Sequence, residues 1–111
     1  MIAPGVWTAA ENLIRKAAKL PATELIAPER AIGRRTEDCI RSGVLYGAVD
    51  AVDGIVRRIK REWPTEAEPL VVATGGLAER VGPLCTEVDE IDADLTLKGL
   101  RIAAECLGMK W

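Results

Sequence analysis

The stretch PLVVATGGL, residues 69–77, decides the fold class of this chain. Its apolar, partly β-branched run is bounded by a proline and by two glycines, which is typical of a short buried strand. The residues that follow, Leu77–Val81, predict a helix, and the mixture of acids and apolar residues in Glu87–Ile91 predicts a half-exposed second strand. Because a strand, a helix and a strand in this order favour a parallel connection, we expect an α/β fold with two strands.

A first helix is predicted upstream of this unit. Thr8 is followed three residues later by Glu11, a capping-box spacing that predicts a helix start at Thr8, and Pro21 is expected to end the helix. The segment 23–35 contains a proline and a glycine and only a short apolar stretch, so it predicts an extended connector rather than a full strand.

The longest predicted helix begins at Thr36 and runs to about Trp63. The Thr36 hydroxyl can cap backbone amides, and the two acids after it lie at the positive end of the helix dipole. The apolar residues of this helix recur every three or four positions, at Ile40, Val44, Ala48, Val52, Val56 and Ile59. A final amphipathic helix is predicted to open at Asp94 and to end at Gly108.

Three glycines, Gly43, Gly47 and Gly54, lie nearly on one line of the long helix. Each costs about 1 kcal/mol relative to alanine, so we expect another backbone to come close to this line. Two alternatives account for it: tight packing on another element of the same fold, or packing against a second protomer.

Composition excludes several classes of function. The chain has 111 residues, a net charge of −2 and 4% aromatic residues, so it offers no footprint for nucleic acid or for an acidic membrane surface. Without histidine it supplies neither a catalytic imidazole nor a His-ligated metal site. No apolar run approaches the ~18 residues of a membrane span and the start lacks a signal-peptide pattern, so we expect a cytoplasmic protein. The widely spaced Cys39, Cys85 and Cys106 predict reduced thiols that act as small buried hydrophobes.

The predicted sheet is small for a complete domain. Two strands are marginal on their own, and Ile2–Gly5 opens the chain as though a strand had just finished. We therefore expect residues 1–111 to be part of a larger domain.

The strongest chemical signal is the strand that ends at Thr74 before Gly75 and Gly76. Two glycines let a backbone approach a ligand without a Cβ in the way and can present amides to a phosphate or a ribose. A tight strand-to-helix turn needs glycines as well, so nucleotide contact and a simple turn are equally supported at this point.

Two further groups of residues carry weaker signals. Ile32–Thr36 (IGRRT) joins two guanidinium groups to a helix start, which suits an anion or a carboxylate but also an ordinary capped helix with solvated arginines. The acids Glu87, Asp89, Glu90, Asp92 and Asp94 could hold a divalent ion, although a solvated strand edge is the better interpretation.

Five motifs in order resemble the C-terminal half of type III pantothenate kinase. They are IAPG (2–5), AENLIRKAAKLP (10–21), IGRRTEDCIRSGVLYGAVDAVDGIV (32–56), ATGGLA (73–78) and DADLTLKGL (92–100). The resemblance implies a ribonuclease-H-like lobe of the actin-like and sugar-kinase superfamily, with 1–111 as a single C-terminal lobe whose N-terminal lobe is absent. It further implies transfer of the ATP γ-phosphoryl group to pantothenate, the first step of coenzyme A biosynthesis, by a dimer.

The resemblance implies roles for five positions. Thr36, with Arg35 beside it, would contact pantothenate bound by the partner protomer, and Thr74, Gly75 and Gly76 would approach the nucleotide. Arg35 stands where the family usually has asparagine. The family uses ATP with Mg²⁺ and a monovalent cation, K⁺ or NH₄⁺. Its phosphate loop, its general-base aspartate and its cation-binding aspartate have no counterpart here, so the resemblance assigns no catalytic residue and no metal ligand.

Two hypotheses about function follow. In the first, the chain is the C-terminal lobe of the kinase and is inactive without a complementary N-terminal half. In the second, it is a non-catalytic module that dimerises or binds other proteins and is related to transcriptional accessory factors of the same family. Its expected partners are accordingly the complementary half or a second copy of the chain, together with pantothenate and ATP.

Overall fold

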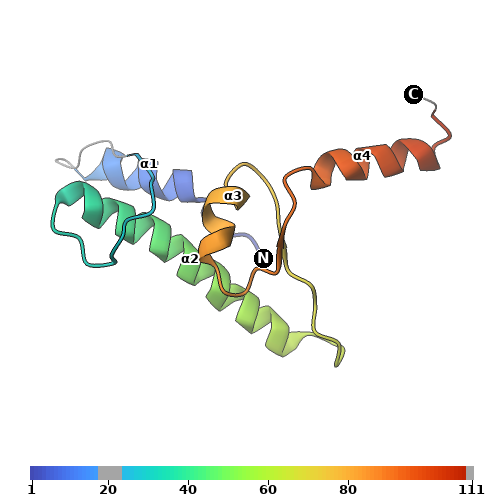
Figure 1. Cartoon of the computed structure of the whole chain (residues 1–111), viewed down its shortest axis with the longest axis horizontal. Coiled ribbons are helices and arrows are strands. Elements are labelled where there is room, and N and C mark those ends of the chain that lie inside the picture. The colour runs from blue at the N-terminus through green and yellow to red at the C-terminus, as the bar shows by residue number, and fades with distance from the viewer. Residues whose placement is uncertain (18–23, 110–111) are drawn as a thin grey trace. The chain divides into compact units, whose positions relative to one another are not determined.

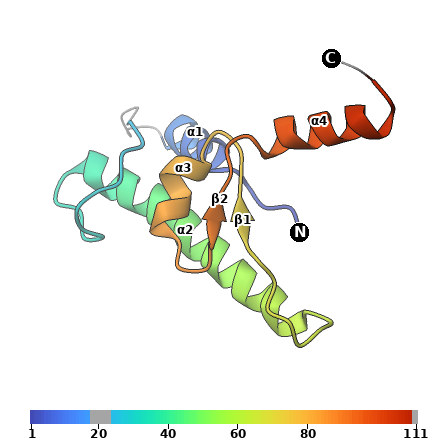
Figure 2. The same cartoon turned by 45° about the vertical axis from the view of Figure 1, so that its right-hand side comes forward.

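The computed structural model describes residues 1–17 and 24–109, in two compact units, Met1–Ile55 and Val56–Trp111. Helices dominate, and two short strands form one parallel sheet (Figures 1 and 2). In chain order the elements are α1 (Val6–Lys16), α2 (Thr36–Glu62), β1 (Val72–Ala73), α3 (Ala78–Val81), the 3-10 turn η1 (Gly82–Leu84), β2 (Glu90–Ile91) and α4 (Leu95–Cys106). The predicted mixture of helices and a small parallel sheet is confirmed.

Helix α1 begins earlier than its capping-box signal predicts. The Ala9 amide donates to the Gly5 carbonyl at 2.9 Å, so Gly5 is the N-cap and Val6 the first helical residue. Thr8 therefore lies inside the first turn, and the prediction that it caps the helix is wrong. Helical backbone ends at Ala17, which is extended; the predicted stop at Pro21 lies outside the described residues.

Helix α2 has the predicted extent but a different N-cap. The Cys39 amide donates to the Arg35 carbonyl at 3.0 Å, which makes Arg35 the N-cap and Thr36 the first helical residue. The chain before it, from Glu24 to Arg35, forms neither helix nor strand, as predicted for a connector. The Thr36 hydroxyl is thus not used as the helix cap.

The core of the first unit joins α1 to the N-terminal part of α2, which lie side by side in Figure 1. Ala10, Leu25, Ile40 and Val44 are its buried members, and Val6 packs against them. The predicted apolar stripe is confirmed at its start and fails at its end, where Ile59 is 39% exposed.

The glycine line of α2 meets no neighbour in the described residues. A Cβ built on Gly43, Gly47 or Gly54 would have nothing within 4 Å. Packing within the described residues of the unit Met1–Ile55 therefore does not account for these glycines, and packing on another part of the fold and packing on a second protomer both stay predictions.

The sheet of the second unit pairs Val72 with Glu90 and Ala73 with Ile91 in parallel register, as predicted (Figure 2). Both strands are shorter than the sequence indicates, and β1 is not buried, since Val72 is 37% exposed. The physical reason is incomplete cover of the pair. Ile91 packs so closely on Gly82 that a Cβ there would lie 2.9 Å from Ile91 Cδ1, yet Ile91 is still 40% exposed, and Val72 and Glu90 are exposed as well.

Helix α4 follows Asp94 as predicted, and Gly108 ends it with a φ of +69°. None of its residues is buried. The expectation of buried cysteines is wrong for Cys39 and Cys106, which are exposed, while Cys85 is partly buried; none of the three forms a disulfide. No helix in the described part of the chain is long and apolar enough to cross a membrane.

Candidate functional site

Three side chains of α2 hold the preceding connector by its backbone. All three donate to carbonyl oxygens of the connector, which leaves the connector's own side chains available for other contacts. The bonds run from Arg41 Nε to Glu24 O (2.9 Å), from Ser42 Oγ to Ala31 O (2.5 Å) and from Tyr46 Oη to Pro28 O (2.8 Å). A segment without helix or strand is thereby given a defined position on α2.

Gly33 brings the end of the connector against the first turn of α2. A Cβ at this position would lie 2.7 Å from the Cys39 amide nitrogen and 2.8 Å from the Cys39 sulfur. Since neither distance is tolerated, glycine is required here by close approach of the backbone.

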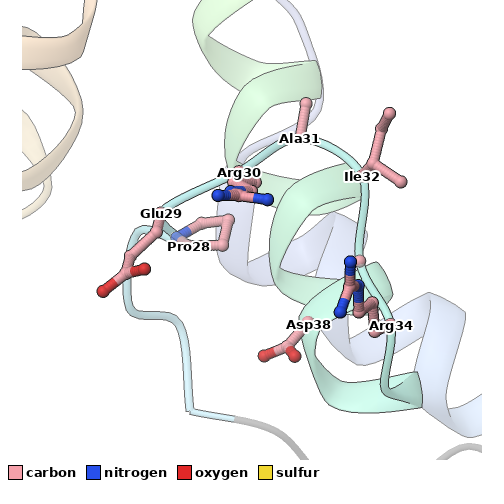
Figure 3. A pocket seen from close by; sticks show the side chains of 8 residues that line it. Pro28, Glu29, Arg30, Ala31, Ile32, Arg34 and Asp38 are labelled. Atoms are coloured by element: carbon pink, nitrogen blue, oxygen red, sulfur yellow. The ribbon is translucent and has the colours of Figure 1, made fainter.

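The anchored connector encloses a pocket. Figure 3 shows its lining: Pro28, Glu29, Arg30, Ala31, Ile32, Gly33, Arg34 and Asp38. Two guanidinium groups and two carboxylates therefore share the lining with apolar side chains. Such a pocket suits a small ligand that has charged or hydrogen-bonding groups and an apolar part.

The predicted residues of this region are partly brought together. Arg34 lines the pocket, whereas Arg35 and Thr36 follow directly in the chain but do not line it, and Thr36 is exposed at the start of α2. The sequence did not predict Arg30 or Asp38 as residues of the site. Arg30 lies in the connector, and Asp38 lines the pocket only because the connector folds over the start of α2. No local signal marked Arg30, because its spacing of four residues from Arg34 brings side chains together only in a helix, and the connector is not helical.

The second predicted group lies in the other unit, at the turn after β1. Gly75 has a φ of +95° and its carbonyl accepts the Ala78 amide at 3.0 Å, so the turn itself demands glycine at this position. Gly76 has no positive φ, and a Cβ there would meet nothing within 4 Å in the described part of the chain. Turn geometry therefore explains the glycine at position 75 but not the glycine at position 76. Thr74, directly before them, is exposed.

The acids around β2 are engaged within the chain. Asp89 accepts the Val71 amide at 2.8 Å, and Asp92 pairs with Lys98 at 2.7 Å. The Lys98 ammonium holds the pKa of Asp92 below its usual value, and Asp92 in turn raises the pKa of Lys98. Within residues 1–17 and 24–109, no group of three or more candidate ligands could hold a metal ion, so a divalent ion at these acids finds no support.

A second ion-pair cluster ties the end of α2 to the segments before β1 and β2. Lys60 Nζ lies 3.0 Å from a carboxylate oxygen of Glu68 and 3.0 Å from one of Glu87, and Arg57 reaches Glu87 at 3.5 Å. Hydrogen bonds to the two carboxylates raise the pKa of Lys60.

Comparison with known proteins supports the resemblance drawn from the motifs. A family model described as type III pantothenate kinase matches residues 1–58. Three curated relatives carry the same name: one from Halalkalibacterium halodurans, 45% identical over 92% of this chain, one from Moorella thermoacetica, 46% over 94%, and one from Thermus thermophilus, 48% over 89%. The matches cover 39%, 40% and 38% of these relatives, in their C-terminal part. The chain thus spans about two fifths of the length of the curated relatives it matches.

Proposed function

Because the chain belongs to the type III pantothenate kinase family, we propose that it forms the ribonuclease-H-like C-terminal lobe of such an enzyme. In this proposal, the lobe takes part in ATP-dependent phosphorylation of pantothenate, the first step of coenzyme A biosynthesis. The observation that carries the proposal is 45–48% identity over about nine tenths of the chain. Since the relatives are much longer, the lobe acts together with a complementary N-terminal half.

The pantothenate side of the proposed site lies at the start of α2. Thr36 is exposed and its hydroxyl does not cap the helix, so it is available to a ligand, and Arg35 stands beside it. Arg30 and Arg34 in the neighbouring pocket offer guanidinium groups that can pair with a carboxylate such as that of pantothenate, although Glu29 and Asp38 in the same lining balance their charge. In the proposed dimer, Thr36 and Arg35 contact pantothenate held by the partner protomer.

The nucleotide side of the proposed site is the turn Thr74-Gly75-Gly76. Open space around Gly76 allows a ligand to approach the backbone, which supports contact with the nucleotide. In the proposal, this turn binds and orients the nucleotide. No residue of the chain transfers a proton in the reaction.

The remaining chemistry belongs to other residues of the enzyme. Phosphoryl transfer needs a metal ion to neutralise charge and a base for the incoming hydroxyl. The motifs that the chain shares with the family include no metal ligand, no general base and no phosphate loop, so the proposal places these groups in the N-terminal half. The monovalent cation, K⁺ or NH₄⁺, is assigned to that half as well.

The test is reconstitution. The chain is co-expressed with the N-terminal part of the Thermus thermophilus relative that precedes the match, and ATP-dependent phosphorylation of pantothenate is measured. We expect activity from the pair and none from either half alone. A stable complex that does not phosphorylate pantothenate would count against the proposal.

The alternative of a non-catalytic interaction module has no observation in its favour, because the relatives reported above all carry the kinase name. Dimerisation through the glycine line of α2 is compatible with either hypothesis and stays a prediction.

A further inference from the structure

The turn that is proposed to approach the nucleotide follows a strand of only two residues. Thr74 comes directly after β1, and none of residues 70–77 is buried. A two-stranded sheet of this length is marginal, so apolar packing does little to fix the register of its strands. The position of the turn therefore depends on the hydrogen bonds that hold β1 beside β2 (Figure 2).

Asp89, directly before β2, holds the residue directly before β1 by both of its backbone groups. Its carboxylate oxygen Oδ2 accepts the Val71 amide at 2.8 Å, and its own amide donates to the Val71 carbonyl oxygen at 2.9 Å. The Glu90 amide donates to the same carbonyl oxygen at 3.2 Å. Asp89 thereby closes a hydrogen-bonded ring with Val71, and this ring fixes the register at the start of β1.

The bonds at the other end of β1 and in the turn run between backbone groups. The Asp92 amide donates to the Ala73 carbonyl oxygen at 2.9 Å, and the Ala78 amide donates to the Gly75 carbonyl oxygen at 3.0 Å. Every residue except proline can make such bonds, whereas the bond from the Val71 amide depends on one side chain. Asp89 is thus a point at which a side chain sets the path of the chain into the turn.

The carboxylate of Asp89 serves as a hydrogen-bond acceptor rather than as a charge. Among the described residues it pairs with no lysine or arginine, whereas Asp92 pairs with Lys98 and Glu87 with Lys60. An amide oxygen accepts a hydrogen bond from a backbone N–H as a carboxylate oxygen does. Asparagine can therefore take the place of Asp89, and alanine cannot.

We propose that Asp89 is a positioning residue for the nucleotide: by holding Val71 it sets the path of β1, and so the place at which the turn Thr74-Gly75-Gly76 presents its backbone. The inference rests on the proposed function. Asp89 acts only through Val71 and the strand that follows. Loss of its carboxylate leaves the Val71 amide without its acceptor, so that β1 and the turn can shift together.

The experiment compares three variants of the full chain. Asp89→Ala removes the acceptor, and Asp89→Asn keeps an acceptor oxygen in a neutral group. Glu90→Ala is the matched control, because the Glu90 side chain is exposed and makes no hydrogen bond or ion pair within the described part of the chain. Amide exchange of residues 71–77 is measured in the chain alone. The affinity for ATP and the KM values for ATP and pantothenate are measured in the complex with the N-terminal part of the Thermus thermophilus relative.

We expect Asp89→Ala to speed amide exchange in residues 71–77 and to weaken ATP binding and raise the KM for ATP about fivefold, as loss of one hydrogen bond does. The KM for pantothenate should change less than about twofold, since the turn contacts only the nucleotide in the proposed function. Asp89→Asn and Glu90→Ala should both resemble the wild type in amide exchange and ATP affinity. A mere loss of folded protein would instead lower kcat and leave both KM values unchanged.

Several results would overturn the inference and leave the proposed function intact. They are an active Asp89→Ala complex that binds ATP as the wild type does, equal losses of ATP affinity in the alanine and asparagine variants, and unchanged amide exchange in residues 71–77 of Asp89→Ala. A wild-type complex that binds no ATP would contradict the proposed function itself, and the role of Asp89 toward the nucleotide would fail with it.

Discussion

The Tyr46 hydroxyl donates to the Pro28 carbonyl oxygen at 2.8 Å, across 18 positions of the chain. This bond and a similar one, from the Ser42 hydroxyl to the Ala31 carbonyl oxygen, hold the pocket-lining connector by its backbone. The pocket therefore owes its shape to the side chains of a helix that contributes only Asp38 to the lining.

Tyr46→Phe tests whether this bond holds the connector. Removal of the hydroxyl leaves the ring in place and the Pro28 carbonyl without its donor, so we expect a loss of about 1 kcal/mol in the free energy of unfolding. We also expect faster amide exchange in residues 24–35. Urea unfolding and hydrogen exchange measure the two effects, and unchanged exchange in the connector would mean that the other anchors suffice.

Gly33→Ala and Gly43→Ala form a matched pair. The new Cβ at position 33 would lie 2.7 Å from the Cys39 amide nitrogen, so the connector must shift, and we expect destabilisation of about 1–3 kcal/mol. At position 43 it meets nothing within 4 Å among the described residues, and better helix propensity should stabilise the chain by up to about 1 kcal/mol. Urea unfolding measures the free energy of unfolding of both variants. Similar changes in the two variants would contradict the close approach at Gly33.

Gly47→Leu tests the predicted second protomer. The position is exposed within α2, so the variant should keep the helical content of the wild type. If the glycine line packs on a partner, the added side chain separates the protomers, and light scattering should show half the mass of the wild-type assembly. A wild-type dimer that persists in the variant would refute packing through this line.

Gly75→Ala and Gly76→Ala separate turn geometry from ligand contact. The φ of +95° at Gly75 is strained for alanine, so that variant should lose about 1 kcal/mol of stability. Gly76→Ala should unfold like the wild type but weaken ATP binding in the reconstituted complex. Calorimetric titration of the complex with ATP measures the second effect, and unchanged affinity would remove Gly76 from the proposed nucleotide site.

The ion pair of Asp92 and Lys98 predicts a pH dependence of stability. The hydrogen bond from Lys98 lowers the pKa of Asp92 from the model-peptide value of 3.8, so the pair stabilises the chain above that pH. This stabilisation is lost as the pH falls through the lower pKa of the folded state. The difference in urea unfolding between Asp92→Asn and wild type should shrink as the pH falls from 7 into the acid range, and a difference that does not change with pH would exclude the pair as its cause.

Local signals predicted most of the elements and few of their boundaries. Gly108 correctly predicted the end of α4 because a glycine acts on the backbone where it stands, and α2 ends within one residue of its predicted boundary. The capping signals misplaced the N-caps of α1 and α2 by one to three residues, since Gly5 and Arg35 serve as caps through their carbonyl groups, which every residue has. The buried character of β1 was wrong because burial depends on what covers each face of the sheet.

The candidate site was predictable only where a motif carried it. Thr36, Arg35 and the turn at 74–76 came from the ordered motifs, whereas Arg30 and Asp38 entered the pocket lining through the fold of the connector. Contacts such as that of Tyr46 with Pro28 leave no periodic trace in the sequence.

The order of the elements, the parallel connection and the family were determined by sequence alone, because they depend on local backbone preferences and on motifs in a fixed order. Tertiary structure showed why two of the glycines are needed, through close approach at Gly33 and positive φ at Gly75, and it showed neither reason at Gly76. It also decided that α4 is uncovered on its apolar sides. The physical reason is that close approach and burial arise from contacts between residues far apart in the chain, which local preferences do not encode.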